Sequence, residues 1–586
     1  SLHKPTMAIA YLLKAEAACD PDPARVQALM GFAYTQLGGR YFIDAIHRFT
    51  NSSRFYGFLP SSAAQADSAE ESAYRVAAVM PNTSSSDPSV LANLVRLKYV
   101  CSDWVEMEAH LTGLHTLITA SLQTLSRSPA NPVFVLAYPL ADELVTRVAV
   151  SYGTYNQATY GQGPAPNWRA TFTYYNWAAS TKRMRVGFMT SDLHSNGVGL
   201  HLERWWVWSV CAASALLDCY ILSTGPSDLG ASPLQDISAS LGADKVVVLD
   251  GLSSPKARAA IRHLQLHMLL DLNGYTQGEL PALINVNGRL APLQMLFYGY
   301  EGSYGNAKAM THIVTDWGSA SVDMAGPLPL GAGRGGQGMF TEHLVLLPPC
   351  KFPSGDLMSP DQVAKCEVPS NTKALSLLYE FHHQVLSGGV QPSNYNDTFV
   401  FCNFAKAFKI QPLVFKAWVR VLQRVPRSVL WLYGYRREGG GEAVRNLRKE
   451  ASQLGLDPTR IIFTNLLERS RHIELKQHAH LYLDTTPYNG HLTVAECLWA
   501  ALPVLTLPQG RMASRVSYSL LHSLDLHSHL VARNLEDYQE LAVAIAKDWL
   551  RVNGNLHRGG QEGREPTKEG AAEQGAAKQG EAATGE

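Results

Sequence analysis

The segment from Leu481 to Trp499 places a glycine-containing turn between an apolar strand pattern and a helical pattern. At the start of such a helix, the first backbone N–H groups have no partner within the helix and point into the cleft. Together with the helix dipole, they form an anion site that suits a pyrophosphate. His491, Leu492 and Thr493 stand at this helix start, so we expect them to contact the phosphate groups of a ligand.

Glu496 allows two interpretations. Thr493 and Glu496 have the spacing of a capping box, in which the two side chains satisfy backbone N–H groups at the helix start. Alternatively, the Glu496 carboxylate binds sugar hydroxyls, as acidic residues beside nucleotide sites do. One carboxylate is not expected to fill both roles, and the sequence leaves both open.

Two further segments carry candidate ligand-binding residues. Lys406 and Lys409 follow the apolar run 398–404, and lysines at the carboxyl end of a strand would meet the same cleft. They are also compatible with solvated surface lysines. His472 lies near the expected start of the helix after 460–464, a position that by itself indicates no particular function.

The Asp-x-Asp spacing, a common metal-ligating pattern, is missing from the parts of the sequence where strand and helix patterns alternate. It occurs at Asp20 and Asp22, in a helical N-terminal region, where it fits a helix start. No carboxylate cluster occurs in the alternating parts. We therefore expect no metal site, with the charge of a pyrophosphate met by helix N-termini and by Lys or Arg.

Short apolar runs alternate with helical patterns in two successive blocks, which predicts βαβ units and parallel sheets. The first block has candidate strands at 183–189, 219–222, 245–249, 267–272, 293–297 and 312–315. The second has candidate strands at 398–404, 428–432, 460–464, 479–484 and 503–507, with helices at 411–424 and 493–501. Two such domains place a ligand cleft between them, facing the carboxyl ends of the strands.

The two ends of the chain differ from these blocks. Residues 1–150 read as helical, with a helical stretch expected from Ser89 to about Leu125. One unit near Val26–Gly39 fits either a tetratricopeptide repeat or an ordinary helical pair. From Val552 the chain is rich in Gly, Ala, Glu, Gln and Lys, so we expect a disordered tail. We expect four parts: a helical region at 1–150, a first α/β domain at 151–365, a second α/β domain at 366–551 and the tail at 552–586.

Composition narrows the class of protein. Among the 586 residues, Lys+Arg and Asp+Glu are both 50, and this balance argues against a general nucleic-acid binder. The eight cysteines are scattered without a CxxC pair, so we expect reduced, mostly buried thiols and an intracellular compartment. No apolar run reaches the roughly 18 residues of a membrane span, so we expect no membrane partner.

A set of short motifs resembles the catalytic region of the O-GlcNAc transferases, which transfer N-acetylglucosamine (GlcNAc) from UDP-GlcNAc to Ser and Thr. Cys101–Trp104 resembles the region where the repeat array of that family meets its catalytic part. The motifs follow in one order between about Ser89 and Leu550. They are Leu272–Gly278, Ala291–Gln294, Tyr298–Gly302, Ile313–Asp316, Cys402–Ile410, Arg424–Leu432, Arg460–Phe463, Asn489–Thr493 and Arg511–Val516.

The resemblance implies an α/β protein with the GT-B fold, two Rossmann-like domains preceded by an α-helical, tetratricopeptide-like region. It also implies UDP-GlcNAc as donor, protein Ser/Thr hydroxyls as acceptors, no metal or cofactor, inversion at the anomeric carbon, and a cytoplasmic or nuclear location. Carried over by position, Lys409 matches a lysine that contacts the donor pyrophosphate, and His472 a histidine beside the uridine. Leu467, Glu468 and Arg469 match a segment that lines the base. His491, Leu492 and Thr493 match the pyrophosphate-binding helix start, and Glu496 an acidic ribose ligand.

Several positions depart from the family pattern. The family carries a functional histidine four residues after Asp192, where this chain has Asn196, with His194 and His201 nearby. An amide cannot accept a proton near neutral pH, so we expect His194 to replace the base or Asn196 to orient the acceptor. The remaining departures are Glu301 for Pro, Lys406 for Gln and Leu475 for Arg.

Two alternatives follow from these features. One is a protein O-fucosyltransferase of the SPINDLY type that uses GDP-fucose, although the Asn489–Thr493 motif is closer to the GlcNAc branch. The other is a non-catalytic nucleotide-sugar-binding relative, which Asn196 favours because it removes the base.

Overall fold

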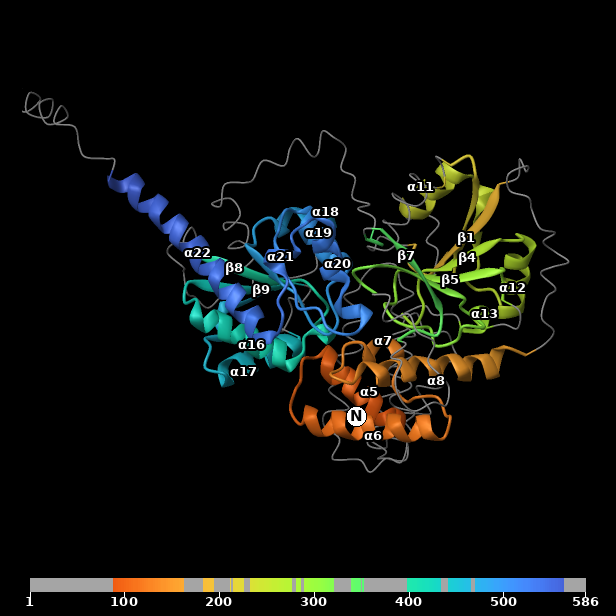
Figure 1. Ribbon diagram of the computed structural model, residues 1–586, viewed down its shortest axis with the longest axis horizontal. Helices are drawn as coiled ribbons and strands as arrows, with labels where there is room; N and C mark the ends of the chain where they lie inside the picture. Colours follow the sequence, from red (N-terminus) through yellow and green to blue (C-terminus); the bar gives the residue numbers. More distant parts are fainter. Residues whose placement is uncertain are drawn as a thin grey trace, which may run out of the picture.

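The computed structural model describes residues 88–162, 183–193, 211, 214–225, 232–276, 281–285, 289–320, 339–348, 350–352, 398–433, 441–464 and 469–562. A helical layer lies below two α/β domains, which stand side by side in Figure 1. Each domain is built on one parallel sheet. The expected tetratricopeptide-like unit lies outside the described residues.

The first domain contains a seven-stranded sheet in the order β3-β2-β1-β4-β5-β6-β7. All its strand pairs among the described residues are parallel. This order, with the first strand in the middle, is that of a dinucleotide-binding doubly wound sheet. The strands are β1 Met184–Thr190, β2 Leu217–Ser223, β3 Val246–Val248, β4 Met268–Asp271, β5 Leu293–Phe297, β6 His312–Asp316 and β7 His343–Leu347.

The second domain repeats this arrangement with five parallel strands in the order β10-β9-β8-β11-β12. Again the first strand of the domain lies inside the sheet, so a crevice forms where the order reverses on either side of it. The strands are β8 Phe399–Asn403, β9 Ser428–Tyr433, β10 Ile461–Thr464, β11 Leu481–Leu483 and β12 Val504–Leu505.

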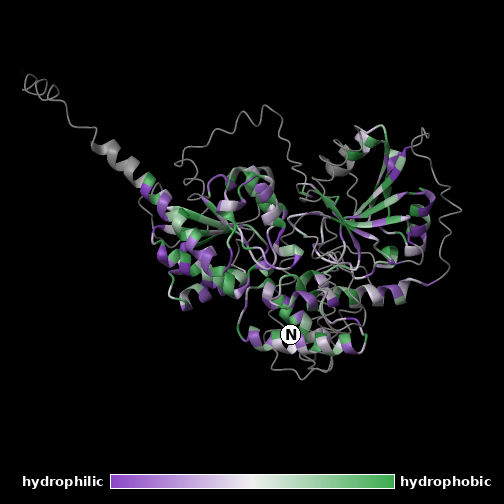
Figure 2. Cartoon of the chain, viewed as in Figure 1, coloured by the Kyte–Doolittle hydropathy of each residue, from purple (hydrophilic) through white to green (hydrophobic). Residues whose placement is uncertain are grey.

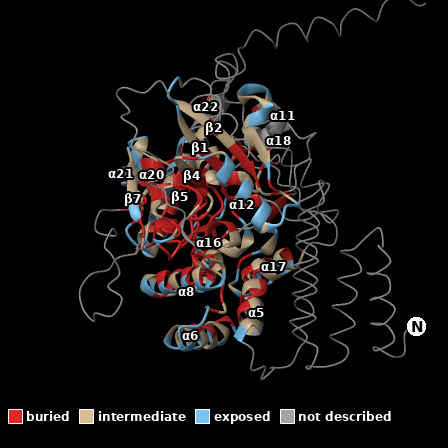
Figure 3. Ribbon diagram, turned by 90° about the vertical axis from the view of Figure 1, so that its right-hand side faces the viewer, coloured by how far each residue is buried: buried red, intermediate tan, exposed pale blue. Residues whose placement is uncertain are grey.

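The strands are short apolar runs because both faces of each sheet are covered. All five residues of β8 and all four of β10 are buried. Figure 2 shows the strands as predominantly hydrophobic, and Figure 3 shows the central strands β4 and β5 buried while the helices expose their outer faces. The covering helices of the first domain are α11 Ser232–Leu241, α12 Ser254–His263 and α13 Pro281–Ile284. Those of the second are α16 Pro412–Arg424, α17 Glu442–Gln453, α18 Arg469–Lys476, α19 Leu492–Trp499, α20 Val516–Ser523, α21 His527–Leu530 and α22 Leu535–Glu562.

The helical layer consists of α5 Pro88–Val100, α6 Met107–Gln123, α7 Pro132–Val135 and α8 Asp142–Tyr160. It contacts the second domain directly, since the Tyr99 hydroxyl donates to Gln411 Oε1 at 2.9 Å. Gln411 in turn donates to the carbonyl of Ala137. Lys406 and Lys409 follow β8 at either end of the short 3-10 helix η7 Ala407–Lys409, next to this contact.

The fold class expected from the sequence is confirmed, and each of the eleven strand intervals contains an observed strand core. Three details differ. The expected helix from Ser89 to Leu125 is two helices, because the chain turns between α5 and α6 with positive φ at Ser102 and Glu106. The edge strand β7 was not expected. Helix α22 continues to Glu562, beyond the expected start of the tail at Val552, and residues 563–586 lie outside the described part.

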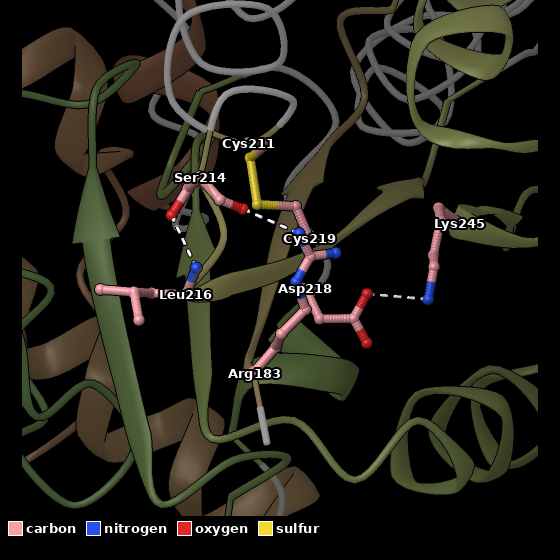
Figure 4. The surroundings of a disulfide bond; sticks show 7 residues. All are labelled: Arg183, Cys211, Ser214, Leu216, Asp218, Cys219 and Lys245. Atoms are coloured by element: carbon pink, nitrogen blue, oxygen red, sulfur yellow. Dashed lines mark hydrogen bonds and ion pairs between the residues drawn. A yellow bond between two sulfur atoms is a disulfide. The ribbon is translucent and has the colours of Figure 1, made fainter. Parts of the chain in front are cut away.

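The expectation of reduced thiols is wrong for two cysteines. Cys211 and Cys219 form a disulfide at the start of β2, with Cα atoms 5.9 Å apart, as Figure 4 shows. Their spacing of eight residues is no recognised sequence signature, so only the path of the chain reveals the pair. Among the described residues, Cys350, Cys402 and Cys497 are free thiols.

Candidate functional site

The loop between β11 and α19 is held by the carboxylate of Asp484, at the carboxyl end of β11. Asp484 accepts from the backbone N–H of Gly490 at 2.9 Å and from the Thr506 hydroxyl at 2.8 Å. Gly490 is required here, because a Cβ would lie 2.8 Å from the Tyr482 hydroxyl and from the Val494 side chain. These contacts fix the point at which α19 begins.

His491 precedes the first residue of α19 with φ 48° and ψ −115°, and no side chain caps the helix. The helix dipole favours an anion at this start, but the backbone N–H groups of Val494 and Ala495 already donate to the carbonyl of His491 at 2.9 and 3.0 Å. The expected capping box is wrong, because the N-cap position belongs to His491 and Thr493 lies inside the first turn. Its backbone N–H bonds to the carbonyl of Gly490 at 3.0 Å.

The imidazole of His491 is buried and lies 3.0 Å from the carbonyl of Ala513 through Nε2. Burial lowers the pKa of His491 well below its usual value, and the charge of Lys409 acts in the same direction. The ring is therefore neutral. Because a carbonyl can only accept, the proton is on Nε2, which leaves Nδ1 as an acceptor. An acceptor nitrogen suits a sugar hydroxyl better than a phosphate oxygen.

Lys409 brings the second predicted segment to this helix start. Its ammonium nitrogen donates to the carbonyl of Asn489 at 2.6 Å and lies 3.7 Å from the centre of the Tyr488 ring. Burial lowers the pKa of Lys409 to about 7, against the opposing effect of Asp484. Lys406, by contrast, is exposed. The structure thus joins Lys409 to the loop before α19. Among the described contacts, no hydrogen bond joins the amino group of Lys406 to that loop.

His472 lies in an aromatic stack at the carboxyl end of β9. Its ring is parallel to that of Tyr433, with centroids 3.5 Å apart, and meets Phe404 edge-on at 5.2 Å. The expected base contact would therefore be made by an edge of the ring rather than by the face packed on Tyr433. Leu467 and Glu468 lie outside the described residues. Arg469 begins α18.

Glu496 is occupied by an ion pair that sequence reasoning missed. Lys476, at the end of α18, donates to the Glu496 carboxylate, and the two side chains are 0% and 12% exposed. The pair ties α18 to α19 beside the predicted nucleotide site. Leu475 is buried in the core, so this departure from the family pattern serves packing. No spacing rule could have paired Lys476 with Glu496 across two elements.

The first domain supplies the opposite wall. Phe352 faces His491, with ring centroids 6.2 Å apart, and packs on Tyr298 at 5.0 Å. Beside it, Lys351 and Glu301 form an ion pair whose side chains are 0% and 1% exposed. Burial raises the pKa of Glu301, while the charge of Lys351 opposes this shift. Glu301 stood out in the sequence, whereas Lys351 lies in a stretch without a recognisable pattern.

The loop after β1 begins at the carboxyl end of the first sheet, as expected. Asn273 holds this end by donating to Asp192 Oδ2 at 2.9 Å and accepting from the backbone N–H of Ser191 at 2.9 Å. His194 and Asn196 lie outside the described residues. In the described part of the chain, no cluster of three or more metal-ligating side chains occurs, and no helix has the length and apolar character needed to cross a membrane.

Comparison with known proteins decides the family. Residues 100–328 and 361–555 match glycosyl transferase family 41. The chain belongs to that family. It is 26% identical over 451 residues to the probable UDP-N-acetylglucosamine–peptide N-acetylglucosaminyltransferase SEC of Arabidopsis thaliana, across 77% of this chain and 42% of that protein. It is 23% identical to the corresponding transferase of Caenorhabditis elegans, across 77% of this chain and 45% of that protein.

This member of family 41 therefore spans less than half the length of these two relatives. It also resembles the solved structure of a mutant of the Thermobaculum terrenum O-GlcNAc transferase, with a TM-score of 0.63 and 19% identity over 95% of this chain and 93% of that one. This likeness confirms the fold, the GT-B arrangement of two Rossmann-like domains.

Proposed function

We propose that this chain transfers GlcNAc from UDP-GlcNAc to Ser and Thr hydroxyls of proteins in the cytoplasm or nucleus, without a metal and with inversion at the anomeric carbon. The names of the SEC and Caenorhabditis elegans relatives support the donor and the peptide acceptor. The motifs at 489–493 and 402–410, which carry the resemblance, lie together at one helix start.

The observation that carries the proposal is the contact between Lys409 and the loop that presents the start of α19. A cation bonded to the Asn489 carbonyl at 2.6 Å stands beside the start of α19, where the helix dipole attracts an anion. Both would bind the pyrophosphate of the donor. Both would also stabilise the negative charge that grows on UDP as the bond to the sugar breaks.

Other residues have proposed roles around this centre. His491, with Nδ1 as acceptor, receives a hydrogen bond from a sugar hydroxyl, while Leu492 offers its backbone N–H and Thr493 its side-chain hydroxyl at the phosphate. Glu496, held by Lys476, accepts from the ribose. Residues 467–469 and His472 lie beside the base.

The transfer is a single displacement. The acceptor oxygen bonds to the anomeric carbon, the bond from that carbon to the phosphate oxygen breaks, and UDP leaves with the electron pair. The hydroxyl proton passes to His194, or to a donor phosphate oxygen or water if Asn196 only orients the acceptor. Loss of turnover in His194→Ala but not in Asn196→Ala would identify His194 as the base.

The decisive experiment is a transfer assay with UDP-GlcNAc and a Ser/Thr-rich peptide, read as the mass of one added N-acetylhexosamine. A parallel reaction with GDP-fucose tests the SPINDLY-type alternative. Binding of UDP without turnover of either donor would support the non-catalytic alternative. Absence of UDP binding would contradict the proposal.

A further inference from the structure

The loop Gln509–Arg515 lies where the helical layer and both α/β domains meet. Its Arg511 is 6% exposed and reaches into the helical layer. Its guanidinium donates to Asp142 Oδ1, at the start of α8, at 2.7 Å. The other N–H groups bond to backbone carbonyls between α7 and α8, at Val135, Leu136, Tyr138 and Leu140, over 2.5–3.2 Å.

The same loop holds the candidate phosphate site on its other side. The carbonyl of Ala513 accepts from His491 Nε2 at 3.0 Å and from the backbone N–H of Asn489 at 2.9 Å. The carbonyl of Asn489 is the acceptor for Lys409. Only one residue separates Arg511 from Ala513, within or beside the 3-10 helix η9 Met512–Ser514.

These contacts form a continuous chain from the first turn of α8 to Lys409 and to the start of α19. We propose that Arg511 is a positioning residue, which sets Lys409 and the start of α19 at His491 for binding of the donor according to the placement of the helical layer. The inference rests on the proposed function and adds to it a route by which the helical region regulates the donor site.

The geometry of the Arg511 side chain explains how the position of the helical layer can determine the position of the loop Gln509–Arg515. Nε donates to the Asp142 carboxylate, Nη1 lies within hydrogen-bond distance of three carbonyls and Nη2 of one, so the planar guanidinium fits in one orientation. A lysine offers a point charge on a flexible stem and cannot make these bonds together. Gly510 lets the loop approach α8 closely, since a Cβ there would lie 2.1 Å from Asp142 Oδ2.

The test compares UDP with uridine, which lacks the phosphates, by titration calorimetry and ligand-observed NMR. Arg511→Lys keeps the charge but breaks the fork, so UDP affinity should fall about tenfold, as expected for losing hydrogen bonds to a charged group. Uridine affinity should not change, because Arg511 has no described contact with the aromatic stack at His472. Arg424→Lys is the matched control, an arginine in an exposed ion pair with Glu540, and should alter neither affinity.

Asp142→Asn provides a second variant, which removes the negative charge that faces Arg511 without touching the loop. This variant should weaken UDP binding several-fold and leave uridine binding unchanged. It tests the inference if Arg511→Lys fails to fold. Equal UDP affinity in the variants and the parent chain would overturn the inference alone. An equal loss for UDP and uridine would also overturn it, as a general destabilisation. Failure of the parent chain to bind UDP would instead remove the proposed function and this inference with it.

Discussion

Lys409 is held in surroundings that disfavour its charged form, although its proposed ligand is an anion. Burial lowers its pKa to about 7, and the nearby carboxylate of Asp484 opposes that shift. A desolvated ammonium bonds more strongly to phosphate than a hydrated one, because little water must be displaced when the ligand arrives. The environment of Lys409 therefore suits ligand binding better than the stability of the free protein.

Lys409→Ala should weaken UDP binding by about one to two orders of magnitude, since a hydrogen bond to a charged group contributes roughly 1.5–3 kcal/mol. The fold should persist, because no core contact depends on the ammonium group. Titration calorimetry measures the dissociation constant, and circular dichroism checks the fold. Lys547→Ala, at an exposed position of α22, is the control. An unchanged dissociation constant for Lys409→Ala would make this lysine a surface residue without a ligand.

UDP affinity should fall as the pH rises from 7 to 9. In the free protein the lowered pKa of Lys409, about 7, means that its cationic form is lost over this range. Each further pH unit then weakens binding by up to about tenfold. His491, whose pKa lies well below its usual value, stays neutral throughout this range. The terminal phosphate of UDP loses its second proton at about pH 6, below this range. Calorimetry across this range tests the slope, which should vanish in Lys409→Ala; equal slopes would assign the effect to another group.

Helices α18 and α19 are joined by the buried pair of Lys476 and Glu496. Lys476→Met should lower the free energy of unfolding by about 3 kcal/mol, because it leaves a carboxylate with little solvent and no cation. Urea denaturation measures the change.

The matched double variant Lys476→Met/Glu496→Leu separates charge from packing. It removes both charges and should recover much of the lost stability. A double variant less stable than Lys476→Met would show that the pair acts through packing instead.

The sequence predicts elements better than it predicts the contacts between them. Buried parallel strands are continuous apolar runs, so β5 could be placed to the residue, and the helix start at His491 follows from a strand, a glycine and a helix in succession. Edge strand β7 was not predicted, because one of its residues is exposed and the other four are only partly buried. The partners of Glu496 and Arg511, which are Lys476 and Asp142, were not predicted either, since each lies on another element and no local sequence pattern indicates the pair.

At the scale of the whole molecule, the charges of the candidate site come from both domains. Lys409 and the start of α19 belong to the second domain, and the Lys351–Glu301 pair belongs to the first. UDP should therefore bind with the same affinity with and without excess EDTA, since protein cations and helix N–H groups supply the counter-charge. A large loss of affinity in EDTA, restored by added magnesium or manganese, would contradict this prediction.

The docking of the helical layer also has a consequence for the order of synthesis. Tyr99 bonds to Gln411, 312 residues later, and Asp142 bonds to Arg511, 369 residues later. A ribosome makes roughly 5–20 residues per second, so α5 to α8 leave it tens of seconds before their docking partners do. Contacts of such sequence separation form late, and until then the faces that will meet the second domain remain open to chaperones. Substitutions on these faces should reduce the yield of folded protein in cells more than they reduce the stability of the finished molecule.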